Sequence, residues 1–240
     1  MRKAGIIPAR YQSTRFPGKP LVDILGKPMI QHVYERSARV SCLDRVLVAT
    51  DDRRIFDAVR SFGGEAIMTR EDHSSGTDRL AEAGLLLGLG DDDIVVNIQG
   101  DEPLVEPAMI ECLVQSLGDA PMATLAFQSH DEEEYASPNV VKVVVDRSMK
   151  ALYFSRSPIP CRRDADGSPL SFLKHLGFYA YRHAFLQRFT RLPAGALETQ
   201  EKLEQLRTLE HGYPIHVALS PVETHGIDTP RDLERILRKG

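Results

Sequence analysis

Residues 94–117, IVVNIQGDEPLVEPAMIECLVQSL, contain the unit that decides the fold: an apolar strand, a polar loop and an amphipathic helix. The run Ile94–Gln99 is short and rich in Ile and Val, which predicts a buried strand. Pro107–Leu117 is the helix candidate, and Pro107 suits the first turn of a helix. Short apolar strands that alternate with helices are typical of a parallel sheet covered by helices on both faces.

The same unit occurs repeatedly in the chain before residue 94. The candidates are the strands Ala4–Ile7, Arg45–Thr50 and Glu65–Met68 and the helices Pro28–Val40, Asp51–Phe62 and Thr77–Leu87. We therefore predict an α/β, Rossmann-like fold with a mostly parallel central sheet. In such sheets ligands bind outside the carboxyl ends of the strands, so the loops that follow the strands are where a site is expected.

The second half of the chain has strand candidates with little helix between them. These strands are Met122–Gln128, Val140–Asp146, Ala151–Ser155 and Leu176–Tyr181. They predict antiparallel additions to the sheet. A helix over Glu198–Glu210, a strand over Ile215–Leu219 and a last helix opened by Thr229 and Pro230 follow. Residues 162–171 are predicted to form an exposed loop, and no linker interrupts the pattern, so we predict a single domain over residues 1–240.

The composition is that of an ordinary globular protein, with 42% hydrophobic and 27% charged residues. The net charge of −4 argues against a general nucleic-acid binder. No apolar run approaches the roughly 18 residues of a membrane helix, and MRKAGIIPAR at the N-terminus lacks a secretory h-region. We therefore expect a cytoplasmic protein. Cys42, Cys112 and Cys161 form neither a CxxC pair nor a zinc pattern.

The loop after the first strand, PARYQSTRFPGKP at residues 8–20, carries the three cations Arg10, Arg15 and Lys19. Cations at the ligand edge of a sheet favour a polyphosphate site, and the alternative is a solvated basic loop. Pro20 follows Lys19, so the loop is not a Walker A motif, and no GxGxxG follows the strand. The loop therefore predicts a nucleotide site of another type.

Two acidic residues are candidates for holding Mg²⁺. Asp101 follows Gly100 at the end of a strand, where the alternative is a simple Gly-Asp turn. Together with the cationic loop, Asp101 favours a metal site, because nucleotide transfer needs both cations and a metal-binding carboxylate. Asp228 comes just before the last helix, where a capping role is the alternative.

Several motifs resemble one enzyme family in the same order along nearly the whole chain. They are IIPARYQSTRFPGKPL, GKPMI, NIQGDEP, YFSR at 153–156, KHLGFYAYR at 174–182, LEQLR at 203–207 and GIDTPRDLERI at 226–236. Together they resemble the 3-deoxy-manno-octulosonate cytidylyltransferases, also called CMP-Kdo synthetases, where Kdo is the eight-carbon acid sugar.

The resemblance implies one domain of the nucleotide-diphospho-sugar transferase type, a homodimer, and Mg²⁺ as cofactor. It implies that CTP and Kdo are the substrates, and that CMP-Kdo is made for lipopolysaccharide synthesis. The site residues that it implies are Arg10 and Lys19 on the triphosphate; Asp101 and Asp228 on magnesium; Arg15, Ser74, Ser75, Gly76, Thr77, Arg79 and Gln99 near the cytidine; and Arg156, His175, Tyr179, Glu204 and Gln205 on the sugar-acid side.

Other interpretations of these residues stay open at this point. His175 could be a core histidine, Tyr179 a packing residue, Glu204 part of a solvated helix face, and Arg79 a partner of Asp78 or Glu82 on its own helix. LETQE at 197–201 differs from the usual run of the family, so an 8-amino analogue of Kdo is an alternative substrate. The alternative functions are a transferase that makes UDP- or GDP-sugars and a non-catalytic nucleotide-binding regulator.

Overall fold

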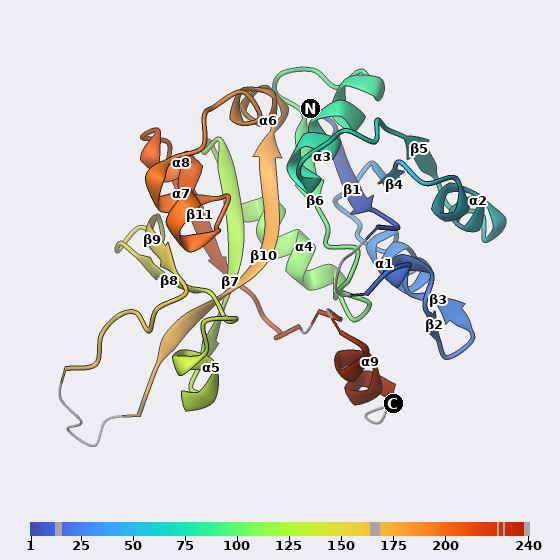
Figure 1. Cartoon of the computed structure of the whole chain (residues 1–240). Coiled ribbons are helices and arrows are strands. Elements are labelled where there is room, and N and C mark those ends of the chain that lie inside the picture. The colour runs from blue at the N-terminus through green and yellow to red at the C-terminus, as the bar shows by residue number, and fades with distance from the viewer. Residues whose placement is uncertain (13–15, 164–168, 225, 228, 238–240) are drawn as a thin grey trace.

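The computed structural model describes residues 1–12, 16–163, 169–224, 226, 227 and 229–237 (Figure 1). Within that part of the chain, nine strands form one sheet, whose main path runs β11-β7-β10-β6-β1-β4-β5. The strands of its first half are β1 (Lys3–Ala9), β4 (Arg45–Thr50), β5 (Ala66–Met68) and β6 (Ile94–Asn97). β1 pairs in parallel with both β4 and β6, and β4 with β5. The predicted parallel core is therefore confirmed.

The strands of the second half extend the same sheet on the other side of β6. They are β7 (Met122–Ser129), β8 (Lys142–Val145), β9 (Ala151–Ser155), β10 (Phe172–Arg182) and β11 (Ile215–Leu219). The long strand β10 pairs antiparallel with β6 and with β7. β8 and β9 form a hairpin, and β8 pairs antiparallel with the first residues of β10, which extend beyond the end of β6. The predicted antiparallel additions are confirmed, although β11 joins β7 in parallel.

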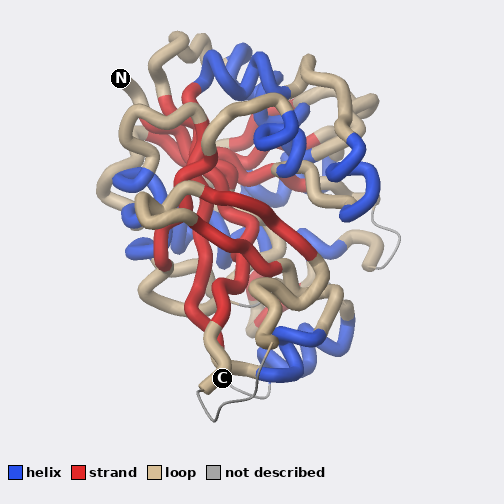
Figure 2. Tube along the Cα trace, turned by 90° about the vertical axis from the view of Figure 1, so that its left-hand side faces the viewer, coloured by secondary structure: helices blue, strands red, loops and turns tan. Residues whose placement is uncertain are grey.

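Helices cover both faces of the sheet, as the view from the side shows (Figure 2). The four helices predicted in the first half are present as α1 (Met29–Ser37), α2 (Arg53–Ser61), α3 (Gly76–Leu86) and α4 (Pro107–Ser116). Local signals explain their starts: Asp52 accepts the N–H of Arg54 at the start of α2, and Ser75 and Asp78 form a capping box on α3. None of the helices in the described residues is long and apolar enough to cross a membrane.

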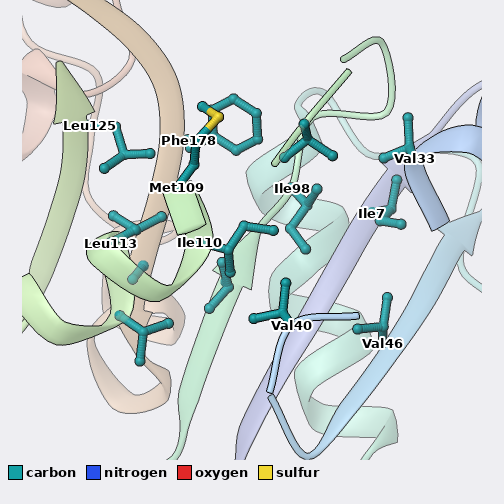
Figure 3. Close-up of a cluster of buried hydrophobic side chains, with 14 of the residues drawn as sticks. Ile7, Val33, Val40, Val46, Ile98, Met109, Ile110, Leu113, Leu125 and Phe178 are labelled. Atoms are coloured by element: carbon teal, nitrogen blue, oxygen red, sulfur yellow. The ribbon is translucent and has the colours of Figure 1, made fainter. Parts of the chain in front are cut away.

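Two apolar clusters lie on opposite faces of the sheet because neighbouring strand residues point to opposite sides. Ile7 and Val96 belong to the cluster under α1 and α4, which also holds Ile110 and Leu113 (Figure 3). Ile6 and Val95 belong to the second cluster with side chains of α3 and of α6 (His183–Phe189). A sheet buried on both faces explains why its strands read as continuous runs of Ile and Val.

Several elements differ from the sequence prediction. The single helix expected over Glu198–Glu210 is instead two short helices, α7 (Ala196–Glu201) and α8 (Leu206–Glu210). The break lies at Lys202, whose φ of 54° is left-handed and ends α7. The elements that were not predicted are η1 (Lys19–Leu21), β2 (Asp23–Ile24), β3 (Lys27–Pro28), α5 (Glu132–Ala136) and α6. The last helix, α9 (Pro230–Leu237), is present as expected.

Candidate active site

The basic and acidic loops meet at the carboxyl edge of the sheet, because β1 and β6 are neighbours. Lys19 Nζ donates to Asp101 Oδ2 at 2.8 Å, and both side chains keep some exposed surface, 15% and 31%. The loop after β6 can lie this close to the end of β1 because residue 100 is glycine. A Cβ at Gly100 would lie 2.9 Å from the carbonyl oxygen of Pro8. The cation predicted for phosphate and the carboxylate predicted for metal thus lie side by side.

Arg10 lines a cavity of about 730 Å³ together with Tyr11, Asp51 and Asp52. Its volume lies within the range of small-molecule sites. The cavity lies between the loop after β1 and the loop after β4, and the side chain of Arg10 is exposed to it. Arg15, the third predicted cation, lies outside the described residues.

The segment before α9 lies on the acidic loop. The N–H of Ile227 donates to the carbonyl oxygen of Asp101 at 2.8 Å, and Thr224 Oγ1 donates to the buried Glu102 at 2.5 Å. Asp228 itself lies outside the described residues. Within the described part of the chain, no group of three or more His, Cys, Asp or Glu side chains is arranged to hold a metal.

The loop predicted near the cytidine forms the start of α3. Ser74 and Ser75 both donate to Asp78, and Gly76 lies against Pro8 at the end of β1. Thr77 Oγ1 donates to Glu204 Oε2 at 2.6 Å. This hydrogen bond joins the nucleotide side of the predicted site to its sugar side, across 127 residues of sequence.

Arg79 has no exposed surface. Its guanidinium donates to Asp51 Oδ2 at 2.5 Å and to Thr69 Oγ1. The alternative pairing with Asp78 or Glu82 is wrong, because the side chain turns inward toward β4 and β5. In this structure Arg79 supports the cavity wall through Asp51 and does not face the cavity directly.

Gln99 contacts the irregular part of β10, which begins after His175. Gln99 Nε2 donates to the carbonyl oxygen of Gly177 at 2.6 Å, where the φ of 71° allows a bulge in the strand. Thr124 Oγ1 donates to the carbonyl oxygen of Phe178, so the 2.9 Å contact with His175 Nε2 requires the histidine to donate. Burial lowers the pKa of His175 to about 3, and the ring is therefore neutral near pH 7.

Tyr179, Glu204 and Gln205 lie close to this bulge or to the start of α8. The Tyr179 ring lies 5.5 Å from that of His175, and burial raises the pKa of Tyr179 above its ordinary value. Burial also raises the pKa of Glu204, although Thr77 donates to it. Gln205 is buried, and among the described residues its Nε2 has no hydrogen-bond partner. A buried donor without a partner is uncommon and suits a ligand site.

Arg156 lies where the end of β9 meets the break between α7 and α8. Its guanidinium donates to the carbonyl oxygens of Glu201, Pro138 and Lys202. The structure therefore brings Arg156 to the junction that also carries Glu204. The ring of Phe154, two residues earlier, lies 5.0 Å from that of His175.

Residues 4–219 match the family described as cytidylyltransferase. The chain belongs to this family. It is 68% identical to the 3-deoxy-manno-octulosonate cytidylyltransferase of Syntrophobacter fumaroxidans, over 99% of this chain and 96% of that protein. It is 54% identical to the 8-amino-3,8-dideoxy-manno-octulosonate cytidylyltransferase of Shewanella pealeana, over 95% of this chain and 94% of that protein.

Solved structures agree with this assignment. A CMP:2-keto-3-deoxy-manno-octonic acid synthetase complexed with CTP matches with a TM-score of 0.93 at 48% identity, covering 100% of this chain and 98% of that one. A 4-diphosphocytidyl-2C-methyl-D-erythritol synthase from Anaerococcus prevotii, at 14% identity and a TM-score of 0.65, covers 99% of this chain and 95% of that one and shares the fold alone. The resemblance read from the sequence motifs and the nucleotidyltransferase fold are both confirmed.

Three further residues of the candidate site were not predicted from the sequence. Asp51 lines the cavity and pairs with Arg79, and Tyr11 lines the same cavity. Asn97 ends β6 opposite Tyr179, and among the described residues its buried Oδ1 has no hydrogen-bond partner. The position of Asp51 directly after a predicted strand was the available signal, and it resembles that of Asp101.

Proposed function

We propose that this cytidylyltransferase joins CTP to Kdo, giving CMP-Kdo and pyrophosphate, and so activates Kdo for lipopolysaccharide synthesis. The observation that carries the reaction type is the contact of Lys19 with Asp101, at the sheet edge from which Arg10 enters the 730 Å³ cavity. Support for Kdo comes from the 68% identity to the enzyme from Syntrophobacter fumaroxidans. Support for CTP comes from the CTP complex of the synthetase with a TM-score of 0.93.

In the proposed reaction the anomeric hydroxyl of the sugar attacks the α-phosphorus of CTP, and pyrophosphate leaves in line. Arg10 and Lys19 would bind the triphosphate and stabilise the charge of the leaving group. Lys19 can exchange Asp101 for a phosphate oxygen, because its ammonium sits on a flexible stem. The step needs positioning and charge stabilisation and no covalent enzyme intermediate.

Asp101 and Asp228 are the residues that we propose to hold Mg²⁺. The donor chemistry fits, because Asp101 offers a partly exposed carboxylate and Mg²⁺ prefers oxygen ligands. The hydrogen bond from Ile227, the neighbour of Asp228 in sequence, to the Asp101 carbonyl supports including Asp228. When bound, the ion would neutralise phosphate charge and lower the pKa of the attacking hydroxyl.

The remaining residues divide into two sides. Arg156 would bind the permanent carboxylate of the sugar acid, and neutral His175, whose Nε2 donates to Thr124, would accept one hydrogen bond at Nδ1 without adding charge. The residues that we propose to line these sides are Arg15, Ser74, Ser75, Gly76, Thr77 and Gln99 for the nucleotide, and Tyr179, Glu204 and Gln205 for the sugar. We also propose a cytoplasmic homodimer, and light scattering after size-exclusion chromatography tests the oligomeric state.

Pyrophosphate release tests the proposed function. The rate is measured with Kdo and each of CTP, UTP, ATP and GTP, and then with CTP and either Kdo or its 8-amino analogue. We expect CTP with Kdo to give the highest rate. Rates with ATP or GTP that equal the rate with CTP would contradict the nucleotide assignment, and a higher kcat/KM for the 8-amino sugar would reassign the sugar.

A further inference from the structure

Arg156 is held in place by residues from two other parts of the chain. Its Nε donates to the Glu201 carbonyl at 2.8 Å, and its terminal nitrogens donate to the carbonyls of Pro138 at 3.0 Å and Lys202 at 3.4 Å. A guanidinium carries five N–H groups. The contacts made by described residues use three, one on each nitrogen, which leaves one N–H on each terminal nitrogen for a ligand.

The carbonyls of Glu201 and Lys202 are available because α7 ends there. The last carbonyls of a helix have no partner within it. Lys202 adopts a left-handed conformation with φ of 54°, and the chain turns away before α8 begins. The break in the predicted helix therefore supplies the carbonyl oxygens that orient the guanidinium of Arg156.

The side chain of Glu201 contacts the same residue from the other direction. Its carboxylate accepts the backbone N–H of Arg156 at 2.9 Å, the hydroxyl of Ser155 at 2.6 Å and that of Tyr153 at 3.4 Å. Burial opposes ionisation of Glu201, but the hydrogen bonds outweigh it and lower the pKa of its carboxyl. Glu201 therefore holds Arg156 with its carboxylate at the backbone and with its own carbonyl at the guanidinium.

The peptide carbonyl of Arg156 is held by a buried cation. Lys142 has no exposed surface, and its ammonium donates to the carbonyls of Arg156 at 2.6 Å, Val140 at 2.7 Å and Ser137 at 2.9 Å. These contacts use all three ammonium hydrogens, as burial of a charge requires. Burial lowers the pKa of Lys142, and the negative charge of Glu201 acts in the opposite direction.

We propose that Glu201 and Lys142 are positioning residues that hold Arg156 ready for the carboxylate of the sugar acid. The inference rests on the proposed function, in which Arg156 binds that carboxylate. A side chain ordered before binding loses less conformational freedom when the ligand arrives. Loosening Arg156 should therefore raise the KM for Kdo roughly 3- to 10-fold, while kcat and the KM for CTP stay within about 2-fold.

A double-mutant cycle tests whether Glu201 acts through Arg156. We expect Glu201→Ala to raise the KM for Kdo by this factor and Arg156→Ala to raise it by roughly 10- to 150-fold. The double variant should be no worse than Arg156→Ala alone, because the interaction is then already lost. Glu201→Gln should restore most of the affinity, since an amide can still accept the Arg156 N–H. Additive effects, or equal increases in KM for both substrates, would overturn the proposal.

Asp146→Ala is the matched control, and it lies in the hairpin of β8 and β9 that Arg156 follows. The Asp146 carboxylate accepts the backbone N–H groups of Ser148 and Lys150 and the Ser148 hydroxyl, in the turn between β8 and β9. It resembles Glu201 in the contacts that it makes but is not in contact with Arg156. We expect Asp146→Ala to leave the KM for Kdo unchanged, and an equal rise in this control would point to general loosening of the hairpin and reject a specific role of Glu201.

A measurement without substrates separates this inference from the proposed function. Hydrogen exchange of the Arg156 Nε–H, followed by NMR, should be slow in the wild type and at least roughly 3-fold faster in Glu201→Ala and Lys142→Met. Asp146→Ala should show the wild-type rate. Unchanged exchange in Glu201→Ala would refute the positioning role even if CMP-Kdo is made. Faster exchange in a chain that makes no CMP-Kdo would support the positioning of Arg156 and refute only the proposed reaction.

Discussion

Removal of the Asp51 carboxylate should destabilise the protein strongly, because it leaves the Arg79 guanidinium buried without its ionic partner. Arg79 has no exposed surface, and the Asp51 side chain is 16% exposed. After Asp51→Ala, the hydrogen-bond acceptors left to the guanidinium among the described residues are Thr69 Oγ1 and the Arg70 carbonyl, which are both neutral. Breaking a buried ion pair from one side costs about 3–5 kcal/mol, so we expect a loss of that size in the free energy of unfolding.

Urea denaturation at pH 7 and one fixed protein concentration measures this loss, with fluorescence and circular dichroism checked for coincident transitions. The control is Asp57→Ala, which breaks the exposed pair with Arg53 on α2 and should change the unfolding free energy little. Replacing both partners, Asp51→Leu with Arg79→Met, should recover part of the loss. A loss for Asp51→Ala no larger than that for Asp57→Ala would refute the idea that Arg79 depends on its ionic partner.

Three further predictions concern the site. Asp101→Asn should lower kcat by roughly 10²- to 10⁴-fold. The control Asp119→Asn, at an exposed position, should leave kcat unchanged. Steady-state kinetics with each substrate varied in turn compares the two variants. Excess EDTA should abolish pyrophosphate release, and added Mg²⁺ should restore it. Undiminished turnover in EDTA would exclude a metal-dependent reaction. The folded pKa of His175 is about 3 and its ordinary value 6.5, so the unfolded state binds the extra proton and stability falls as the pH drops below 6.5. Urea titrations between pH 6.5 and 4.5 should show a contribution of at most about 1.4 kcal/mol per pH unit, and His175→Gln should remove it; equal slopes would show that His175 does not titrate this way.

The parallel half of the fold could be predicted because its signals are local. The strands there are short and mostly apolar, and Asp52, Ser75 and Pro107 mark helix starts within a few residues. The position of Lys19 and Asp101 at the ligand edge also followed, since both loops come after strands and such loops share one edge of a parallel sheet. Their direct hydrogen bond was not predicted. Whether the whole chain is one domain stays a prediction.

The misses arise where distant residues decide the local structure. Residues 198–210 are rich in good helix formers, so the sequence alone favours one helix. The carbonyls at Glu201 and Lys202 instead bind Arg156, the residue that follows β9. For Arg79 the alternative partners in the sequence were Asp78 and Glu82, one and three residues away on its own helix, whereas its partner Asp51 lies 28 residues earlier. In both cases a cation selects carbonyl or carboxylate oxygens that the fold brings near, and no pattern within a short window reports that choice.

The long strand β10 explains how the second half of the chain reaches the site edge. Because β10 runs antiparallel to β6, the last residue of β6, Asn97, pairs with Tyr179 in the middle of β10. The earlier residues of β10, His175 among them, therefore extend beyond the end of β6, past the edge where the Gln99 and Asp101 loop begins. A parallel strand could offer only the loop after its end at this edge, whereas the antiparallel strand offers side chains from its middle. Rigid strand positions thereby supply the predicted sugar side, and the Gln99 hydrogen bond to Gly177 joins them to the loop that carries Asp101.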